Sequence, residues 1–349
     1  MKTILVTGGT GYIGSHTSLE LLKKGYRVII FDSLVNSSEK VINKINLLLN
    51  DKNLDNKFTF IKGDLSEAKL LEGVFEGSKE KGSPISSVIH FAGLKSVAES
   101  VSNPLKYWDK NVGGSINLFK IMEKFDCRTI IFSSSATVYQ IKGNSFLRES
   151  SPIQASNPYG QTKVAIESLL NDIFLNSQNN WKIVNLRYFN PIGAHDSGLL
   201  GEDPIGIPTN IFPIINKVAI NEIPKLQIYG NDWPTHDGTG LRDYIHVMDL
   251  ADGHIAAMEY LEKNKSQIIN LNLGTGKSTS VLDLVKIFEQ VNKVKIKYEF
   301  VSRRKGDHGV VVADNSLAKN LLNWQPKRNI YQMCKDGWNW QINNLKGYD

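Results

Sequence analysis

Residues 2–14 read KTILVTGGTGYIG, a short run rich in β-branched residues that breaks directly into glycines. The run predicts a buried strand, and the segment from His16 to Lys24 predicts the helix that follows it. Gly8, Gly11 and Gly14 permit a tight turn, close approach of the backbone to a pyrophosphate, and close packing of the helix on the strand. The order of strand, glycine turn and helix therefore predicts a dinucleotide site at a helix N-terminus.

A second strand, Arg27 to Phe31, ends in Asp32. An acid at this place in the fold accepts hydrogen bonds from the ribose of an adenosine. No arginine follows Asp32 directly, and its carboxylate would repel a 2′-phosphate. The sequence therefore favours NAD over NADP as the cofactor.

Further apolar runs continue the alternation of strands and helices. Strands are expected at Phe58–Lys62, Val88–Phe91, Thr129–Ser133 and Lys182–Arg187. This rhythm predicts an α/β fold, a Rossmann-type doubly wound parallel sheet, with ligands beyond the carboxyl ends of its strands. After Tyr188 the chain becomes rich in glycine and proline, which indicates a smaller α/β substrate-binding domain. The expected ranges are residues 1–188 plus 242–265 for the NAD-binding domain, and 189–241 plus 266–349 for the second domain.

Composition limits the function without deciding it. The chain has 349 residues, 41% of them hydrophobic, a net charge of +6 and two cysteines, Cys127 and Cys334. Basic and acidic residues are interspersed, so no nucleic-acid partner is expected. No apolar run approaches the length of a membrane span, and no signal peptide precedes the first strand, which predicts a cytoplasmic protein without a membrane partner. The cysteines lack metal-ligand spacing, so no metal is expected.

Tyr159 and Lys163 lie four residues apart in the segment Asn157-Pro158-Tyr159-Gly160-Gln161-Thr162-Lys163. Asn157 is suited to cap a helix and Pro158 to begin it, which places the pair on one face of the first turns. An apolar stripe continues that helix through Ile166, Leu169, Leu170, Ile173 and Phe174. An adjacent ammonium and a helix N-terminus would lower the pKa of the tyrosine from about 10 toward about 7. Such a tyrosine can donate and accept a proton near neutral pH, although two fixed positions are by themselves a weak signal.

A run of serines, 133–135, stands at the end of the expected strand Thr129–Ser133. The Ser135 hydroxyl could hydrogen-bond the substrate oxygen that Tyr159 deprotonates. Small serines also turn a chain at a strand end, and on their own they indicate no more than that. Together with Lys163, however, they complete a Ser/Tyr/Lys group that moves a proton while NAD takes a hydride.

At this point the chain resembles the extended branch of the short-chain dehydrogenase/reductase superfamily, and within it the UDP-glucose 4-epimerase (UDP-galactose 4-epimerase) family. The resemblance extends from Thr7 to Trp324. Its most specific segments are HFAGLK at 90–95, SSSATVY at 133–139, RYFNPIGAH at 187–195, GEDP at 201–204 and GLRDYIHV at 240–247.

The resemblance implies an isomerase of galactose metabolism that interconverts UDP-galactose and UDP-glucose at sugar C4, through a transient 4-ketopyranose and tightly bound NAD. It implies a homodimer, and it assigns Tyr159, Lys163 and Ser135 as catalytic residues. Contacts to NAD are implied for Gly8, Gly11, Tyr12, Ile13, Gly14, Asp32, Asn36, Asp64, Leu65, Phe91, Ala92, Lys95, Asn111, Tyr159, Lys163 and Tyr188. Contacts to the UDP-sugar are implied for Ser135, Tyr159, Asn190, Asn210, Tyr229, Arg242, Val311, Arg304 and Asp307.

The implied substrate residues suit a nucleotide sugar. Arg242 and Arg304 would clamp the pyrophosphate, for which the guanidinium fork is suited, and Tyr229 could lie against the uracil. Val311 stands where the family has a residue that sets the volume of the sugar pocket. The small valine extends the expected substrates to UDP-N-acetylglucosamine and UDP-N-acetylgalactosamine. The family pattern is lost in the loop Gln140–Leu147, where glutamine follows Tyr139 in place of the usual glycine.

Two other functions are open at this stage. A nucleotide-sugar 4,6-dehydratase shares the fold, NAD and the Tyr/Lys pair, but its second step requires carboxylates in the serine segment. Residues 134–137 are Ser, Ser, Ala and Thr, and none is acidic. A non-catalytic regulator that senses NAD would retain the glycine turn without needing Tyr159, Lys163 and Ser135 together.

Overall fold

The computed structural model describes residues 1–50, 57–141, 143, 146–178, 180–206, 208–304 and 306–348. These residues divide into two compact units. Unit 1 comprises residues 1–140, 152–187 and 251–271, and unit 2 comprises 141–151, 188–250 and 272–349. Within the described ranges, no helix is both long and apolar enough to cross a membrane.

Unit 1 is built on a seven-stranded sheet. Its strands are β1 (Thr3–Thr7), β2 (Arg27–Asp32), β3 (Phe58–Lys62), β4 (Ile85–His90), β5 (Thr129–Ser135), β6 (Lys182–Tyr188) and β11 (Gln267–Leu273). The strand order is β11-β6-β5-β4-β1-β2-β3, and β1 pairs in parallel with both β2 and β4. The order reverses between β1 and β4, which makes the ends of these two strands the switch point where such sheets bind ligands. The predicted α/β doubly wound fold is confirmed.

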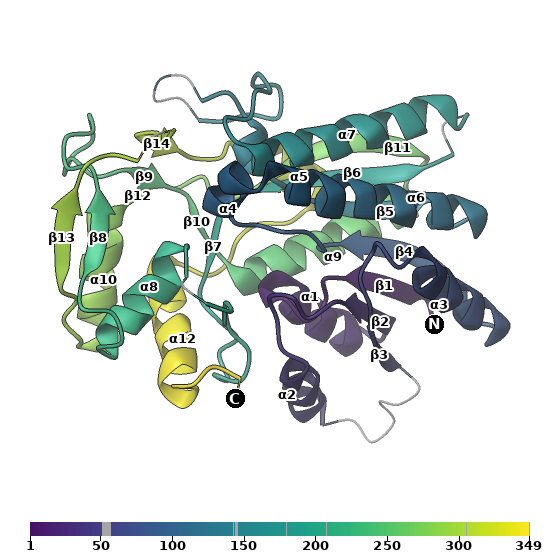
Figure 1. Ribbon diagram of the computed structural model, residues 1–349, viewed down its shortest axis with the longest axis horizontal. Helices are drawn as coiled ribbons and strands as arrows, with labels where there is room; N and C mark the ends of the chain where they lie inside the picture. The colour runs from purple at the N-terminus through teal and green to yellow at the C-terminus, as the bar shows by residue number, and fades with distance from the viewer. Residues whose placement is uncertain are drawn as a thin grey trace. The chain divides into compact units, whose positions relative to one another are not determined.

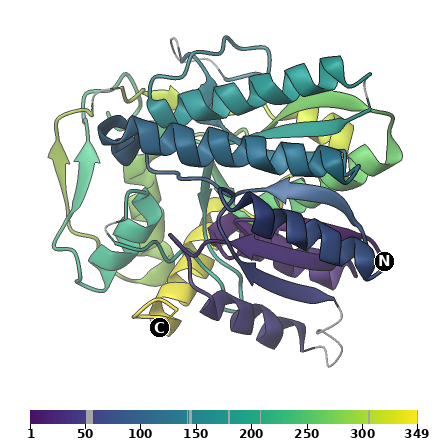
Figure 2. The same ribbon diagram turned by 45° about the vertical axis from the view of Figure 1, so that its right-hand side comes forward.

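Helices cover both faces of this sheet (Figures 1 and 2). They are α1 (Tyr12–Lys23), α2 (Lys40–Leu49), α3 (Ala68–Glu80), α4 (Val97–Ser102), α5 (Pro104–Tyr107), a π-helix (Trp108–Gly113), α6 (Gly114–Lys124), a 3₁₀ turn (Ala136–Val138), α7 (Pro158–Asn176) and α9 (Val247–Lys263). α3 packs beside α6 on one face, whereas α1 and α9 lie on the other, where Lys24 pairs with Glu259 at 2.7 Å. The core between them includes Phe31, Phe132 and Trp181, each at most 1% exposed.

Unit 2 has shorter strands. They are β7 (Asn190–Ile192), β8 (Leu226–Tyr229), β9 (Leu241–Arg242), β10 (Tyr244–His246), β12 (Thr279–Ser280), β13 (Tyr298–Val301) and β14 (Val310–Val311), and its helices are α8 (Ile211–Ala219), α10 (Val281–Asn292), α11 (Ser316–Leu322) and α12 (Ile330–Asn343). The strands form small sheets with the orders β10-β7, β12-β9-β14 and β13-β8. An apolar core around Phe212, Leu284 and Phe288 fills the space between the helices.

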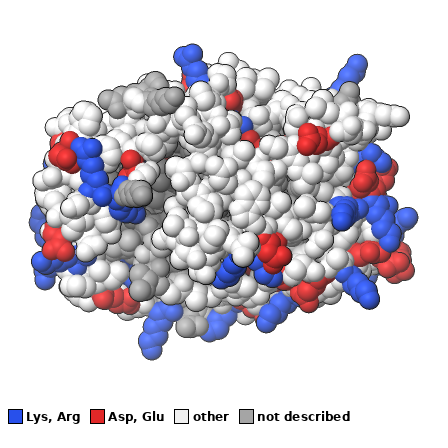
Figure 3. Space-filling view, turned by 45° about the horizontal axis from the view of Figure 1, so that its top comes forward, with Lys and Arg blue, Asp and Glu red and all other residues white. Residues whose placement is uncertain are grey.

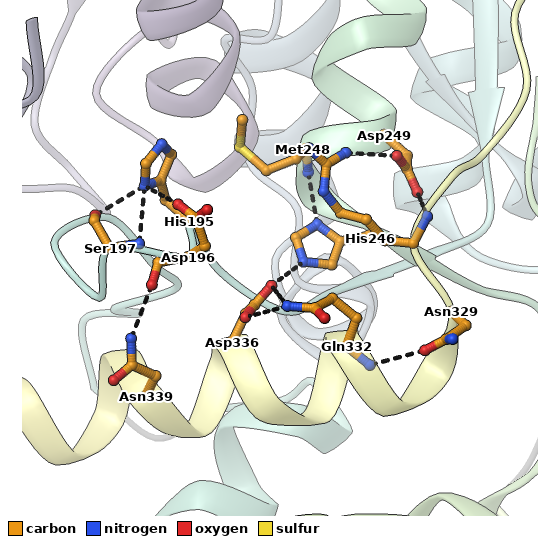
Figure 4. Close-up of polar contacts among 11 residues, drawn as sticks. His195, Asp196, Ser197, His246, Met248, Asp249, Asn329, Gln332, Asp336 and Asn339 are labelled. Carbon is orange, nitrogen blue, oxygen red and sulfur yellow. Dashed lines mark hydrogen bonds and ion pairs between the residues drawn. The ribbon is translucent and has the colours of Figure 1, made fainter.

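Buried polar side chains connect the irregular segments of unit 2. Asp243, fully buried, accepts hydrogen bonds from the Thr275 amide at 2.7 Å, the Gly276 amide at 2.9 Å and the Ala313 amide at 3.2 Å. Figure 4 shows a second connection, in which His246 points toward Asp336 of α12 at 3.2 Å. The Met248 amide donates to the other ring nitrogen of His246, so the ring nitrogen that faces the carboxylate carries the proton.

The observed elements differ from the expected ones at several places. The first helix begins at Tyr12 rather than His16, and β4 begins at Ile85 rather than Val88. The edge strand β11 was not expected, and it brings residues 266–271 into unit 1. Residues 141–151 lie in unit 2 because the Leu147 amide donates to the Val312 carbonyl, and residues 242–250 because β9 and β10 pair inside that unit.

Candidate active site

The glycine turn follows β1 as expected. Gly8 has a φ of +70°, and a Cβ on it would lie 2.7 Å from the Ala92 nitrogen. A Cβ on Gly14 would lie 2.2 Å from the Gly8 carbonyl oxygen, so glycine is required where the helix meets the turn. Gly11 is the N-cap of α1, and among the described residues no side chain caps this helix or places an acid in its first turn. The amides of Tyr12 and Ile13 therefore begin a helix N-terminus suited to a phosphate, which fits a dinucleotide.

Asp32 is the last residue of β2 and is 8% exposed. One carboxylate oxygen accepts a hydrogen bond from the Thr10 amide at 3.0 Å, and the other from the Leu34 amide at 2.9 Å and the Ser37 hydroxyl at 3.1 Å. The carboxylate thus fixes the glycine turn to the segment after β2. Asn36 is an exposed residue of that segment.

The other implied cofactor residues follow β3 and β4. Asp64 is half-buried, and although burial opposes it, hydrogen bonds from Ser66 and Lys110 hold its pKa below the ordinary value. Leu65 is buried, Phe91 and Ala92 are half-buried directly after β4, and Lys95 is exposed. These residues stand at the carboxyl ends of the strands, where the fold places a ligand.

Asn111 lies in the π-helix and is 2% exposed. Its amide oxygen accepts from the Leu94 amide at 2.8 Å, and its nitrogen donates to the Leu94 carbonyl at 3.1 Å and the Thr162 hydroxyl at 3.1 Å. Asn111 therefore anchors the segment after β4 to helix α7. The hydrogen bonds of its side chain are made to Leu94 and Thr162 of the protein itself.

Helix α7 begins as the sequence predicts. The Asn157 side chain accepts a hydrogen bond from the Gly160 amide at 2.9 Å, and Pro158 is the first helical residue. Ile166 and Leu170 are buried in the core of unit 1, with Leu169, Ile173 and Phe174 packed against it. The helix therefore presents the beginning of its buried face, with Tyr159 and Lys163, to the end of β5.

The Ser/Tyr/Lys group is brought together in unit 1. Tyr159 hydrogen-bonds Ser135, and the Lys163 ammonium lies 5.8 Å from the centre of the Tyr159 ring. The Ser135 oxygen accepts from the Thr137 amide at 3.2 Å and from its hydroxyl at 3.0 Å. Because those bonds use the lone pairs of Ser135, its own proton is directed at the phenol oxygen.

The pKa values of the pair differ from the sequence-based expectation. Burial raises the pKa of Tyr159, and the hydrogen bond with Ser135 offsets only part of that increase. The ammonium of Lys163 donates to the Ser133 carbonyl at 2.7 Å and lies over the Phe132 ring, rather than at the phenol oxygen. Burial also lowers the pKa of Lys163 to about 8. The expected pKa near 7 for Tyr159 is therefore wrong for the protein alone, because desolvation acts on both groups.

Sequence reasoning missed a buried network directly behind this group. Glu167, one helical turn after Lys163, accepts hydrogen bonds from Ser134 of β5 and Arg187 of β6, and Arg187 also donates to the Tyr139 hydroxyl. A signal for it was present. Glu167 directly follows Ile166 in the buried stripe of α7, and a carboxylate at such a position requires a buried partner.

The implied substrate residues of unit 2 form a cluster around Asp307. Arg242, the last residue of β9, donates to Asp307 at 2.7 Å, and Arg304 donates to its other oxygen at 3.4 Å. The Arg304 guanidinium stacks on the Tyr229 ring at 4.5 Å. Val311 pairs with Arg242 in the ladder between β14 and β9. The cluster presents two guanidinium groups and an aromatic face, a set suited to a nucleoside diphosphate.

Three further residues have other contacts. Asn210 is exposed and donates to Glu202 at 2.8 Å, and the Asn190 amide of β7 donates to the Asp243 carbonyl at 3.0 Å. Tyr188 is buried at the end of β6. Lys142, Asn144 and Ser145 of the divergent loop lie outside the described residues.

A tyrosine joined to a serine hydroxyl and a buried lysine, beside a dinucleotide turn, is the proton-transfer group of the short-chain dehydrogenase/reductase class. A sequence model of the GDP-mannose 4,6 dehydratase family matches residues 5–337. The UDP-glucose 4-epimerase of Bacillus subtilis (strain 168) is 47% identical over 346 residues, which cover 99% of this chain and 98% of the relative. On this evidence the chain belongs to the UDP-glucose 4-epimerase family, a family of isomerases.

Solved structures agree with this assignment. The UDP-glucose 4-epimerase of Bifidobacterium longum, in complex with NAD⁺ and UDP, is 43% identical with a TM-score of 0.92 and covers 99% of this chain and 100% of its own. The enzyme of Stenotrophomonas maltophila, with bound NAD and formylated UDP-arabinopyranose, is 42% identical with a TM-score of 0.93 and covers 99% of each chain. The family predicted from the sequence is therefore confirmed.

Proposed function

We propose that this protein interconverts UDP-galactose and UDP-glucose by inverting the configuration at sugar C4, with NAD held throughout. The observation that carries the proposal is the hydrogen bond between Tyr159 and Ser135 beside the buried Lys163. This group sits in unit 1, whose sheet also carries the glycine turn, in a chain 47% identical to a UDP-glucose 4-epimerase.

The residues of unit 1 form a binding site for a dinucleotide. The N-terminus of α1 takes the pyrophosphate, Asp32 takes the adenosine ribose, and the residues after β3 and β4 line the remaining length. When bound, NAD accepts a hydride from C4 of the sugar and returns it to the opposite face of the same carbon. Because the cofactor ends each cycle in its starting state, no external reductant is needed.

Tyr159 moves the proton. As the phenolate it removes the proton of the C4 hydroxyl, and as the phenol it returns that proton to the 4-ketopyranose oxygen. Ser135 donates to the phenol oxygen and so favours the phenolate. Lys163, whose pKa burial lowers to about 8, can carry the positive charge that favours the phenolate at neutral pH.

Unit 2 holds the nucleotide while the sugar turns. Arg242 and Arg304 bind the two phosphates, and Tyr229 offers its ring to the uracil. Asp307 orients both guanidinium groups through its two oxygens.

The experiment is incubation of the purified protein with UDP-galactose, without added NAD, followed by identification of the product. UDP-glucose is expected, with NAD released when the protein is denatured. A 4-keto-6-deoxy product would replace the proposal with dehydration, although residues 134–137 offer no carboxylate for it. A protein that binds NAD but converts neither UDP-galactose nor UDP-glucose would instead be a regulator.

The small side chain of Val311 supports a wider range of sugars. Val311 is half-buried in β14 and pairs with Arg242, so its side chain belongs to the same cluster as the proposed diphosphate site. Epimerisation of UDP-N-acetylgalactosamine is the expected result. Turnover confined to the unacetylated sugars would remove this extension and leave the main proposal intact.

A homodimer in the cytoplasm completes the proposal. Val97, Val101, Leu105 and Trp108 recur at helical spacing along α4, α5 and the π-helix, and they are between 42% and 84% exposed. In Figure 3 the charged side chains of both signs stand mostly toward the rim and leave a broad uncharged area. A second copy would cover such a stripe. Light scattering of the purified protein distinguishes a dimer from a monomer, and a monomer at micromolar concentration would remove this part.

A further inference from the structure

A buried ion pair crosses unit 1 behind the Ser/Tyr/Lys group. Arg187 is 2% exposed, and its fork donates to both oxygens of Glu167, at 2.9 Å and 2.5 Å. The Ser134 hydroxyl donates to the same carboxylate at 2.5 Å, and the remaining nitrogen of the fork donates to the Tyr139 hydroxyl at 3.1 Å. Three elements are therefore joined through one carboxylate: β5, β6 and α7.

Ser134 connects this network to the Ser/Tyr/Lys group. Ser134 lies between Ser133, whose carbonyl accepts a hydrogen bond from the Lys163 ammonium, and Ser135, which hydrogen-bonds Tyr159. Glu167 is one helical turn from Lys163 on the same face of α7. The hydrogen bond of Ser134 to Glu167 thus lies between two others that join the end of β5 to α7, and it helps to hold the strand against the helix that carries the other two members of the group.

Charge is the second effect of the network. Among the described residues, the charge of Lys163 interacts with Glu167 of α7 and with His90 of β4, and Arg187 of β6 pairs with Glu167 and contacts Tyr139. Burial, assisted by the charge of Lys163, lowers the pKa of His90 to about 3, so His90 is neutral at working pH. Arg187 is permanently charged, so it cancels the carboxylate one turn from Lys163.

We propose that Arg187, Glu167 and Ser134 are positioning residues of the reaction, which hold the Ser/Tyr/Lys group in one arrangement and keep an uncompensated negative charge away from it. The proposal rests on the proposed function, because it assigns these residues a role in the same proton transfer. It concerns residues that contact neither the substrate nor the cofactor in this scheme.

The test is the pH profile of kcat for epimerisation of UDP-galactose between pH 6 and 10. In Arg187→Met the carboxylate of Glu167 loses its partner and favours the protonated forms of both Tyr159 and Lys163. Both limbs of the profile are then expected to move to higher pH by about one unit. In Arg187→Met/Glu167→Gln both charges are absent, so the limbs are expected back at the wild-type pH, with kcat still about tenfold lower.

Two further variants separate position from charge. Arg187→Lys retains the charge without the fork, so the limbs should stay in place while kcat falls. Ser134→Ala retains both charges and removes the contact from β5, and it is expected to lower kcat about tenfold at unchanged KM. Ser134→Ala also keeps the proposal testable if Arg187→Met, with its buried unpaired carboxylate, does not fold.

Arg328→Met is the matched control. Arg328 pairs at 2.6 Å with Asp249, which is 1% exposed and lies in unit 2. Its loss should lower the melting temperature without moving either limb. The proposal is overturned if Arg187→Met keeps the wild-type limbs, if the double variant keeps the shift, or if Ser134→Ala has the wild-type kcat. A wild-type protein that turns over no UDP-sugar would instead overturn the proposed function.

Discussion

Unit 1 and unit 2 hold their functional residues in different ways. In unit 1 most of the candidate residues stand at or after the ends of strands of five to seven residues in one sheet, or begin a 19-residue helix. In unit 2 they stand on strands as short as two residues, and side chains such as Asp243 and Asp307 hold the segments together. Backbone ladders therefore position the proton-transfer group, whereas hydrogen bonds of a few carboxylates position the proposed diphosphate site.

This difference separates the expected effects of substitutions. A change in the Ser/Tyr/Lys group should affect the chemical step and leave the fold unchanged, because the sheet does not depend on it. A change in a carboxylate of unit 2 should affect the fold or the binding of substrate. Four predictions test the distinction.

The largest effect is expected for Tyr159→Phe. Without the phenol oxygen no group transfers the C4 proton, so kcat should fall by at least about 10³-fold, while NAD content and melting temperature stay near wild type. Product formation is measured by chromatography of the UDP-sugars. Tyr107→Phe is the matched control, because Tyr107 is fully buried in α5 of the same unit and bonds Glu99. A Tyr159→Phe protein with substantial turnover would refute the assignment.

The next effect is on the stability of unit 2. Asp243→Asn replaces a carboxylate that accepts from three amides with a side chain that has one acceptor oxygen. At least one buried amide then loses its partner, at a cost of about 3 kcal/mol in the free energy of unfolding. Denaturant unfolding, followed by tryptophan fluorescence, measures this cost. Asp126→Asn is the control, since Asp126 is 83% exposed, and its loss should cost under about 1 kcal/mol.

A smaller effect is expected in the proposed diphosphate site. Arg242→Ala removes one of the two guanidinium groups on Asp307 and should raise KM for UDP-galactose about 30-fold with kcat nearly unchanged. Arg303→Ala is the neighbouring control, because Arg303 stacks on Trp233 and pairs with Asp232 instead. Equal changes in KM for the two variants would show that this cluster does not select the diphosphate.

The smallest effect, taken per unit of pH, concerns Lys163. Burial lowers its folded-state pKa to about 8, whereas the unfolded chain keeps a value near about 10.4. Between these values the unfolded chain holds a proton that the folded chain has released, so the stability of the wild type relative to Lys163→Met should rise with pH. The expected slope is about 1.4 kcal/mol per pH unit between pH 8 and 10. Lys295→Met, at a side chain that is 90% exposed, should show no such slope.

Sequence reasoning reached much of unit 1 because its signals are local. The glycine turn, Asp32 at the end of β2, and Asn157 before Tyr159 each depend on neighbours within a few residues, and each stands in the structure where it was expected. The same reasoning missed the ion pair of Glu167 with Arg187, because the two residues are 20 positions apart and meet only when helix α7 packs onto the sheet that contains β6.

The pKa of Tyr159 and the boundaries of the units were harder to predict from the sequence, because both depend on contacts between distant residues. Desolvation depends on everything packed around the phenol, and no four-residue spacing contains that information. Strands such as β9 and β14 have two residues each, too short for a periodic pattern, so their pairing was not visible before the structure.

The position of β11 has a consequence for the order in which the chain folds during synthesis. Strand β6 ends at Tyr188, but its outer neighbour begins only at Gln267, after residues 188–250 of unit 2 have been made. Until then the ribosome carries a sheet whose β6 edge is open, with hydrogen-bonding groups available to another nascent chain. The sheet of unit 1 therefore cannot be completed until part of unit 2 has been synthesised. A chain released before that point would be prone to aggregate through the open edge of β6.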